Sequence, residues 1–526
     1  MCFLGYREPP WLMETVDHVK VRGPELRERL KGPSGHSSAT LDSERRCRGT
    51  RMSETTSQPT SDRPLPPRVS SLPLVGSLPR LIADPLSFME QAQREQGDIF
   101  SMDLGFTQVI GLCHPRYVHH VLVEHAHKYS KGGPMWDSMR TFMGNALPMS
   151  EGAFWKRQRR MIQPSFHHQR VSMMTDTMVE AIDECLLEWD LAALEGKPFD
   201  VSVALSRVTM TVLVRTLFGS GMDKEDAEKV AQAFSFILEY FIAGMVTHSL
   251  PEWMPVPGRQ RYRESIKTID EIMTRLIERG REQASGEDNL LSLLLQAVDG
   301  ESGERMTNAQ LRDEALGFFI AGYDTTAAGM TWVLHALTQH PEVTDKVRVE
   351  LDAVVGTRRP GFADLMRMPY TRNVLQEALR IHSPSVWLPR LSVVEDEIDG
   401  YRIPPGVMMV IFTRLIHRHP GIWDDPLTFD PDRFTPERSE GRHKLAWLPF
   451  GSGQRQCIAK EFSLLEGMLI MARIVSRYEL SAVPGRVPQE RVSTNLRTKD
   501  GMWLNLRPRL PEAKAQVSRL PLSGTA

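Results

Sequence analysis

The segment 307–340 constrains the fold of this chain more than any other stretch of its sequence. Thr307 and Gln310 form the pattern of a helix capping box, and Pro341 ends the run, so we expect one continuous helix. At 1.5 Å per residue this helix is roughly 50 Å long, enough to cross a whole domain. Its middle, 315–321, is apolar on every face, which predicts that the helix is buried.

The rest of the chain is predicted to be mainly α with small β-sheets. Neither a composition break nor an internal repeat follows Leu65, so we expect one unit over 65–510. A unit of that size usually forms around something central, and a buried cofactor would serve. Helical periodicity marks 86–96, 151–163, 174–193, 203–218, 225–246, 259–285, 343–354 and 365–382, and strand-like runs mark 99–111, 391–412 and 488–507.

The two ends of the chain are expected to lie outside this unit. Residues 33–66 are rich in Ser, Thr, Pro, Gly and charge, so they cannot bury enough apolar surface to offset their ordering entropy. We therefore predict that 1–64 is disordered, or is an extension upstream of a true translation start at Met52. Residues 511–526 are predicted to form a C-terminal tail.

Composition excludes several classes of function. A formal charge of −2 gives no electrostatic reason to expect nucleic acid as a partner. The five cysteines are scattered without a CxxC pair, which argues against a disulfide framework or a structural zinc site. No run approaches 18 consecutive apolar residues, so we predict no membrane span and a soluble, cytoplasmic protein.

A glycine-rich turn that ends in a cysteine is the strongest chemical signal. It reads Phe450-Gly451-Ser-Gly453-Gln-Arg455-Gln-Cys457, and an apolar helical run, 458–475, follows it. The glycines permit positive φ angles, so backbone N–H groups can point at one atom. A cysteine at the start of a helix is favoured as the thiolate, which can ligate iron. A buried cysteine beside a glycine-rich turn is the plain alternative, and the full spacing of Phe, Gly, Arg and Cys argues against it.

Polar residues in the middle of the long helix form a second pattern. A carboxylate such as Asp324 is costly inside a core unless it has a partner or a chemical role. Gly322 leaves room for a small ligand, and the Thr325 hydroxyl can bond an i−4 carbonyl or reach into that room. Together the acid and the alcohol can relay protons. An ordinary polar stripe on a long helix is the alternative.

Two further patterns place charged side chains on one face of a helix. Glu377 and Arg380 are three residues apart, and arginine can bond a carboxylate through two N–H groups. A solvated surface pair is the alternative, although the neighbouring residues make this helix largely apolar. Trp155 and Arg159 are four residues apart, a spacing that suits a bound carboxylate. A basic amphipathic surface helix is the alternative there.

In this order and spacing, the four patterns resemble the cytochrome P450 family from about Leu65 to Arg509, in its soluble bacterial type without a fused reductase. The resemblance implies haem b as cofactor, with Cys457 as the axial ligand to its iron. It also implies a single P450 fold, with the haem buried between the long helix, about 307–340, and the helix of the cysteine loop, about 457–476. Ala459 departs from the glycine that the family usually has there.

The resemblance assigns roles to residues around the haem. Glu377, Arg380 and Arg433 would form a buried ionic knot that supports the cysteine loop. Asp324 and Thr325 would be the catalytic pair that delivers protons during dioxygen activation. The implied cofactor contacts, besides Cys457, are Trp155, Arg159, Arg390, Arg455, Phe450, Gly451 and Gly322.

The substrate pocket implied by family position is apolar. The methionine-rich segment 134–149 suits a lid that repacks around varied ligands, with plain core packing as the alternative. We therefore expect a lipid-like, terpenoid or steroid-like substrate, with dioxygen as cosubstrate. The predicted pocket residues are Met143, Phe318, Phe319, Ala321, Val386, Trp387 and Asn495.

Electrons are expected from a separate protein, because no flavin or iron–sulfur segment follows Cys457. A ferredoxin or flavodoxin with an NAD(P)H-dependent reductase is the predicted partner. The predicted reaction is hydroxylation or epoxidation of an apolar small molecule. A haem-thiolate isomerase, a peroxide-driven enzyme and a non-catalytic haem sensor are the alternatives. A basic docking face, or merely a solvated charged face, is expected at Lys156, Arg157, Arg160 and Lys460.

Overall fold

The computed structural model describes residues 63–105, 107–219, 221–247, 254–282 and 289–509. These residues belong to the second of two compact units, Gln58–Ala526. The predictions for 1–62 and for the C-terminal tail lie outside the described residues. The predicted domain boundary near Leu65 therefore stays a prediction.

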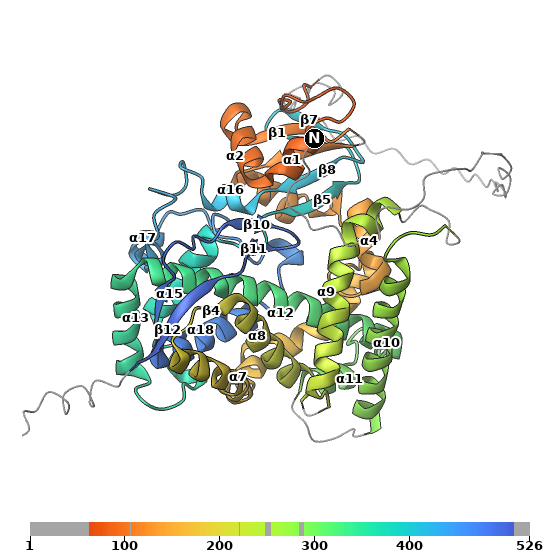
Figure 1. Ribbon diagram of the computed structural model, residues 1–526. Coiled ribbons are helices and arrows are strands. Elements are labelled where there is room, and N and C mark those ends of the chain that lie inside the picture. The colour runs from red at the N-terminus through yellow and green to blue at the C-terminus, as the bar shows by residue number, and fades with distance from the viewer. Residues whose placement is uncertain (1–62, 106, 220, 248–253, 283–288, 510–526) are drawn as a thin grey trace, which may run out of the picture. The chain divides into compact units, whose positions relative to one another are not determined.

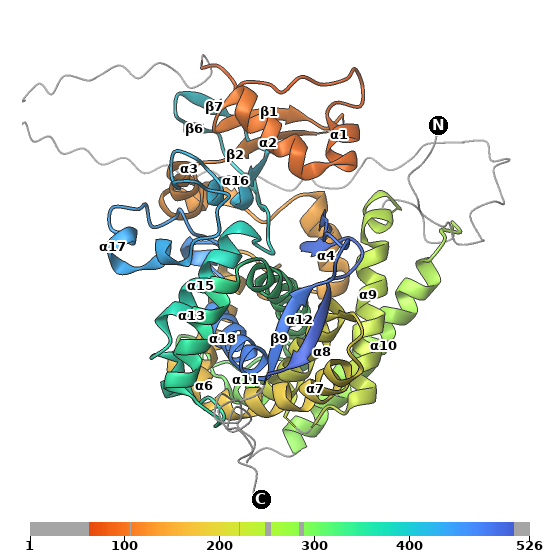
Figure 2. The ribbon, with the colours of Figure 1, turned by 60° about the vertical axis from the view of Figure 1, so that its left-hand side comes forward.

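The long helix α12, Asn308–Gln339, runs through the middle of the helical part of this unit (Figures 1 and 2). Thr307 accepts from the backbone N–H of Gln310, and the Gln310 side chain bonds back to Thr307, so the predicted capping box is confirmed. The helices that pack against it include α8, Val201–Phe218; α10, Arg259–Glu282; α15, Pro369–Ile381; and α18, Lys460–Arg477. Residues 315–319 are buried as predicted, but Ala321 is exposed.

Most of the predicted helices are confirmed to within a few residues. They are α2 (Pro85–Gln96), α5 (Gly152–Ile162), α7 (Thr175–Glu195), α9 (Lys224–Thr247), α10 (Arg259–Glu282) and α13 (Pro341–Val354). The predicted helix 365–382 is instead divided into α14, Phe362–Leu365, and α15, because Pro369 starts a new helix at its first turn. Seven further short α-helices in the described part of the chain were not predicted: α1 (Leu78–Ala83), α3 (Pro115–His119), α4 (Pro134–Met143), α6 (His168–Met173), α11 (Leu290–Gln296), α16 (Thr413–His417) and α17 (Pro436–Ser439).

The sheets are small, as predicted. The largest has the order β1-β2-β8-β5-β3, with β1 (Ile99–Asp103), β2 (Gln108–Leu112), β8 (Met408–Ile411), β5 (Leu388–Ser392) and β3 (Tyr129–Ser130). It carries Arg390 on β5, and β2 pairs with β8 in parallel. Near α12 a hairpin forms from β10, Glu490–Val492, and β11, Leu496–Thr498. This hairpin matters for the site, because Asn495 and Arg497 both contact α12.

Helix α8 is the one described helix that is long and apolar enough to cross a membrane. Buried residues make up 61% of it. Its Thr209 hydroxyl donates to the Tyr323 carbonyl of α12 at 2.9 Å, and Leu213 lies against Gly322. These contacts are those of a core helix, and a core helix passes the same test of length and composition.

Candidate active site

The loop that carries Cys457 is held by its backbone. Gly451 and Gly453 have φ angles of 66° and 69°, so the predicted positive φ values are confirmed. A side chain at position 453 would overlap the carbonyl of Leu122, so only glycine fits there. The Cys457 N–H donates to the Phe450 carbonyl at 2.9 Å, which closes the turn.

The helix after the cysteine starts later than predicted. Helix α18 begins at Lys460, and Ala459 is its N-cap residue, so the predicted start at Ile458 was wrong. The apolar side chain of Ile458 packs against the main core from the turn, so its apolar character did not indicate that it belongs to the helix. Cys457 therefore lies in the turn that leads into α18.

The sulfur of Cys457 faces an opening inside the protein. Burial raises the pKa of this thiol, whereas the Ala459 N–H and the charges of Arg159 and Lys131 lower it. Yet the residue is exposed. We infer that protein atoms surround the thiol on most sides, while its sulfur projects into a space that water can reach. Ala321 is likewise exposed in the otherwise buried middle of α12, which indicates that this helix borders the same kind of opening.

Positive charge is concentrated around this opening. Arg390 is 7% exposed, and burial, with Arg455 nearby, lowers its pKa to about 10. Burial also lowers the pKa of Lys131 strongly, with Arg390 and Arg455 adding to the effect. Glu151 pairs with Arg455 at 2.7 Å. Within the described residues, Lys131, Arg159 and Arg390 have no ion pair with a carboxylate.

An uncompensated cluster of this kind fits an anionic group. Leaving cations buried without anions costs several kcal/mol per ion on the order-of-magnitude scale. Haem carries two propionate groups, and its iron can take a cysteine thiolate as axial ligand, so the residues present fit it. The sequence did not single out Lys131, because a lone lysine before Gly132 and Gly133 carries no distinguishing pattern.

The predicted pair Trp155 and Arg159 lies beside the cysteine loop. Arg159 donates to the Gln456 carbonyl at 3.0 Å, next to Cys457. The Trp155 ring is 8% exposed, and the guanidinium of Arg455 lies over it at 3.9 Å. Arg455 also donates to the Ser150 carbonyl at 2.8 Å. The indole therefore supports Arg455 by a cation–π contact.

The structure brings Glu377, Arg380 and Arg433 together. Both oxygens of Glu377 accept from Arg380, at 2.6 and 2.8 Å, and both side chains are fully buried. The Arg433 Nε lies 3.3 Å from Glu377. Arg380 further donates to the carbonyls of His417 and Pro426. This ionic knot thus fixes the chain that precedes the cysteine loop.

Asp324 and Thr325 point to different partners. Asp324 accepts from the Asn495 amide at 2.6 Å and forms an ion pair with Arg497, both on the β10–β11 hairpin. The Thr325 hydroxyl donates to the Ala321 carbonyl at 2.6 Å, one of the two roles considered for it. We call the Asp324–Asn495–Arg497 group the hairpin clamp. Arg497 was missed because 173 residues separate it from Asp324 in the sequence.

A second carboxyl group lies close to this pair. Glu466 of α18 is 2% exposed and forms a side-chain hydrogen bond with Thr326. Burial raises its pKa to about 8, although Thr326 lowers it somewhat. At neutral pH this carboxyl is therefore largely protonated, and its partner Thr326 directly follows Thr325 in the chain.

Several predicted pocket residues do not face open space. Met143, Phe319 and Val386 are at most 2% exposed, because they are packed in the core. The Phe319 ring contacts Tyr323, and the Phe318 ring contacts Phe166. An apolar lining and an apolar core look alike in a sequence, so the assignment of these residues to the pocket stays a prediction. Ala321 is exposed, Trp387 is partly exposed, and Asn495 belongs to the hairpin clamp.

The predicted basic docking face is largely neutralised. Arg160 pairs with Asp299 at 2.7 Å and with Glu301 at 2.8 Å. Arg157 pairs with Glu304. These acids follow α11 in the chain, so the sequence did not show that they would cover the arginines. Of the four predicted side chains, only Lys156 has no salt bridge among the described residues; Lys460 forms a long one, 3.9 Å to Glu461.

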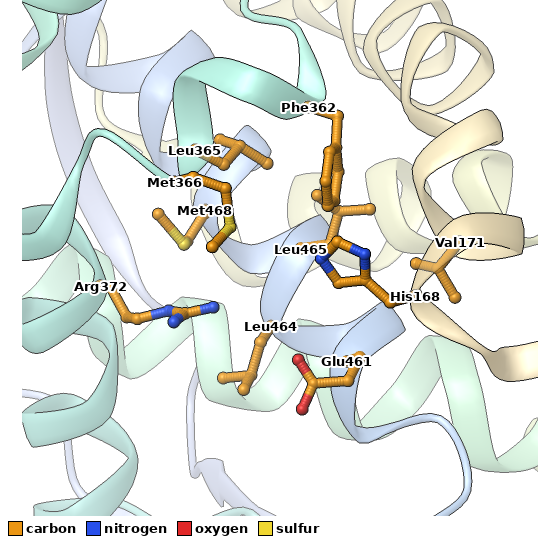
Figure 3. Close-up of a pocket in the computed structure, with 10 residues that line it drawn as sticks. All are labelled: His168, Val171, Phe362, Leu365, Met366, Arg372, Glu461, Leu464, Leu465 and Met468. Atoms are coloured by element: carbon orange, nitrogen blue, oxygen red, sulfur yellow. The ribbon is translucent and has the colours of Figure 1, made fainter.

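A small pocket elsewhere is unrelated to this site (Figure 3). It lies between α6, α14, α15 and α18, with room for about one water molecule. Its walls are mostly apolar, and none of the site residues described above lines it. The lining residues are His168, Val171, Phe362, Leu365, Met366, Arg372, Glu461, Leu464, Leu465 and Met468.

Comparisons with known proteins agree with this geometry. A family model described as Cytochrome P450 matches residues 65–504. The cyclooctat-9-en-7-ol 5-monooxygenase of Streptomyces melanosporofaciens is 32% identical over 416 residues, which cover 79% of this chain and 89% of that protein. The pentalenene oxygenase of Streptomyces avermitilis is 30% identical over 415 residues, covering 79% and 91%.

The similarity is not confined to bacteria. Human cytochrome P450 4F2 is 28% identical over 428 residues, covering 76% of this chain and 81% of that protein. Among solved structures, the cytochrome P450DA haem domain superposes with a TM-score of 0.79 at 25% identity, covering 86% of this chain and 99% of that one. The chain therefore belongs to the cytochrome P450 family, and it is a haem-dependent monooxygenase.

Proposed function

We propose that this monooxygenase hydroxylates or epoxidises an apolar, terpenoid-like small molecule. The observation that carries the proposal is the exposed Cys457, whose thiol lies near the charges of Arg159 and Lys131, two side chains without an ion pair among the described residues. The terpenoid-like substrate rests on the printed activities of two relatives, which act on cyclooctat-9-en-7-ol and as a pentalenene oxygenase. The exposed Ala321 and the partly exposed Trp387 give the opening an apolar lining.

Residues of this chain would hold the cofactor at both its centre and its edge. We assign Cys457 as the thiolate ligand to the iron, backed by the Gly451–Gly453 turn. Arg390, Arg455 and Lys131 would pair with the two propionates, which offsets the cost of the unpaired charges of Arg390 and Lys131. Thiolate-bound haem activates dioxygen, so that one oxygen atom enters a C–H or C=C bond and the other becomes water.

Protons would reach the reaction past the polar stretch of α12. Thr325 presents a hydroxyl on the side of the helix that bears the exposed Ala321. Asp324 can take protons from solvent when Arg497 releases it, because Arg497 is partly exposed to water. Glu466 holds a proton at neutral pH and is bonded to Thr326. Protons could therefore reach Thr325 by two routes, one through Asp324 and one through Glu466 and Thr326.

The partner and location follow as parts of the proposal. A separate ferredoxin or flavodoxin with its NAD(P)H-dependent reductase would supply the electrons. Lys156 and Lys460 remain for its contact, since Arg157 and Arg160 are already paired. Cys113 and Cys457 form no disulfide among the described residues, which fits a reducing cytoplasm.

The assignment of Cys457 is tested spectroscopically. Reduced protein under carbon monoxide is expected to show the red-shifted Soret band of thiolate ligation. Cys457→His should abolish that band while haem is retained. Persistence of the band in Cys457→Ala would show that another residue is the ligand.

The reaction class is tested by product analysis. With surrogate ferredoxin, reductase and a panel of terpenes, oxygenated product should require both NADPH and dioxygen. Product that forms with hydrogen peroxide alone would favour a peroxide-driven enzyme. A rearranged product without oxygen incorporation would favour an isomerase.

A further inference from the structure

A short π-helix gathers three metal-binding side chains on the surface. This helix, η2, spans His120–Glu124 and directly follows α3. The N–H of His125 donates to the carbonyl of His120 at 2.8 Å, five residues back. In an α-helix, residues five apart point in different directions, whereas the wider π-turn brings them together. The unusual backbone therefore places His125 near His120.

The side chains of these residues are close enough to share one ion. The imidazole rings of His120 and His125 have centroids 4.2 Å apart. Glu124 Oε1 lies 3.7 Å from His125 Nε2. One ligand atom from each of the three residues falls within 4.8 Å of the other two. Zinc bonds of about 2.0–2.2 Å to nitrogen and oxygen are reached by small side-chain rotations.

A buried carboxylate orients one of these imidazoles. Asp396 lies 2.8 Å from His120 Nε2, and its side chain is 4% exposed. It also accepts from Lys128 at 2.6 Å and from Tyr129 at 2.7 Å, so its position is fixed. When His120 donates from Nε2, its Nδ1 keeps a lone pair for a metal. Such a carboxylate–histidine pair is the usual support behind a metal-binding histidine.

We propose that His120, Glu124 and His125 bind a divalent transition metal ion of the zinc type. Two imidazoles and one carboxylate supply three ligands, and water completes the coordination. Half-buried histidines and the oriented ring distinguish this group from a merely acidic surface cluster: the side chains of His120 and His125 are 19% and 31% exposed. No step of the proposed oxygenation depends on it.

The position of the site gives it a structural consequence. The carbonyl of Leu122, in the middle of η2, lies against Gly453 of the cysteine loop. A metal ion that ties Glu124 to His120 and His125 would hold the π-turn closed. Because the turn backs onto the cysteine loop, zinc should raise the thermal stability of the folded protein.

The test uses haem-loaded full-length protein without a histidine tag, in which haem occupies Cys457. After treatment with chelator, ZnCl2 is titrated against a chromophoric competitor, and melting is followed in parallel. We expect one tight equivalent per chain and a higher Tm. His120→Ala combined with His125→Ala should weaken zinc binding by at least 10-fold, and Glu124→Gln by several-fold.

A matched control comes from the same patch. His127 flanks the site and does not belong to the three-ligand group, whereas His119 lies 3.7 Å from Glu124 and is left unchanged. His127→Ala should leave the zinc affinity within about twofold of wild type. An equal loss in His127→Ala and in the double variant would mean diffuse binding to a histidine-rich surface and would overturn the proposal. Absence of a tight equivalent in wild type would overturn it too. The intact Soret band of each variant shows that it is folded.

Discussion

The ionic knot and the hairpin clamp each pair an arginine with a carboxylate, but the two pairs differ in their exposure to water. In the knot, Arg380 and Glu377 are fully buried, and two backbone carbonyls receive further N–H groups of Arg380 within 2.7 Å. In the clamp, Asp324 is 8% exposed in its side chain but Arg497 is 42% exposed. Opening the knot leaves charge stranded in the core, whereas opening the clamp lets Arg497 move into water. The first arrangement fixes a loop, and the second can release a carboxylate.

The largest expected effect is on the knot. Arg380→Ala removes both hydrogen bonds from Arg380 to the buried Glu377 and leaves Arg433, 3.3 Å away, as the remaining ion-pair partner. It also leaves the carbonyls of His417 and Pro426 without donors, and together these losses should cost about 3–5 kcal/mol of unfolding free energy. Haem-loaded protein is expected to fall in yield accordingly. Urea unfolding measures the cost. The matched variant in the clamp, Arg497→Ala, should cost no more than about 1 kcal/mol, because Arg497 is partly solvated. Equal losses of unfolding free energy in the two variants would show that the knot and the clamp stabilise the fold to the same extent.

Sequence patterns anticipated these two networks to different extents. Glu377 and Arg380 lie one helical turn apart, so local spacing alone predicted their pairing. Arg433 was assigned through family resemblance, and the structure places it 3.3 Å from Glu377. Arg497 had no local signal, since only the return of the β10–β11 hairpin brings it to α12.

The same limit applies to the predicted pocket. Phe318, Phe319 and Ala321 of α12 were assigned to it by family position, but side-chain packing decides which of them face open space. Phe319 packs on Tyr323, whereas Ala321, two residues further along the chain, is exposed. The course of the long helix was predictable because its capping box and its proline stop are local. The residues that line the pocket were not predictable, because α8 and the loop 144–148 cover part of the α12 surface and the sequence does not show which part.

The second expected effect separates the clamp from the knot by function. Asp324→Asn keeps the shape of the side chain but removes its capacity to carry a proton. Turnover should fall on the order of 100-fold, the scale of general acid–base catalysis, with little change in haem binding. Thr325→Ala should instead preserve NADPH consumption and divert it to hydrogen peroxide. Product per NADPH, with peroxide quantified, measures both. Unchanged coupling in Thr325→Ala would place the relay elsewhere.

The third effect concerns pH and the buried Glu466. Burial raises the pKa of this carboxyl from 4.5 to about 8 in the folded protein. The folded state therefore keeps a proton that the unfolded chain releases near pH 4.5. The resulting stabilisation is complete below that pH and is lost as the pH rises towards 8, at up to about 1.4 kcal/mol per pH unit. Glu466→Gln should remove this slope.

Urea unfolding at pH 5.5, 6.5 and 7.5 measures the difference between the two proteins. Wild type should lose stability relative to Glu466→Gln as the pH rises. Glu314→Gln is expected to behave alike, since burial raises the pKa of Glu314 to about 8 as well. Parallel stability curves for wild type and Glu466→Gln would mean that Glu466 titrates normally in the fold.

The smallest effect is expected from loosening the clamp without removing its acid. Arg497→Gln keeps a hydrogen-bond donor for Asp324 but removes the opposing charge, while Asn495 continues to donate at 2.6 Å. Unfolding free energy should change by less than about 1 kcal/mol, because Arg497 is partly solvated. If release of Asp324 limits proton delivery, kcat should rise or fall by a few-fold and its solvent isotope effect should change, with KM nearly constant. Arg491→Gln is the matched control, since Arg491 lies opposite Arg497 in the same hairpin and is exposed. A shift in KM alone, or the same response in both variants, would show that the hairpin acts through substrate binding. The clamp would then be a structural contact like the knot, made weaker by its exposure to water.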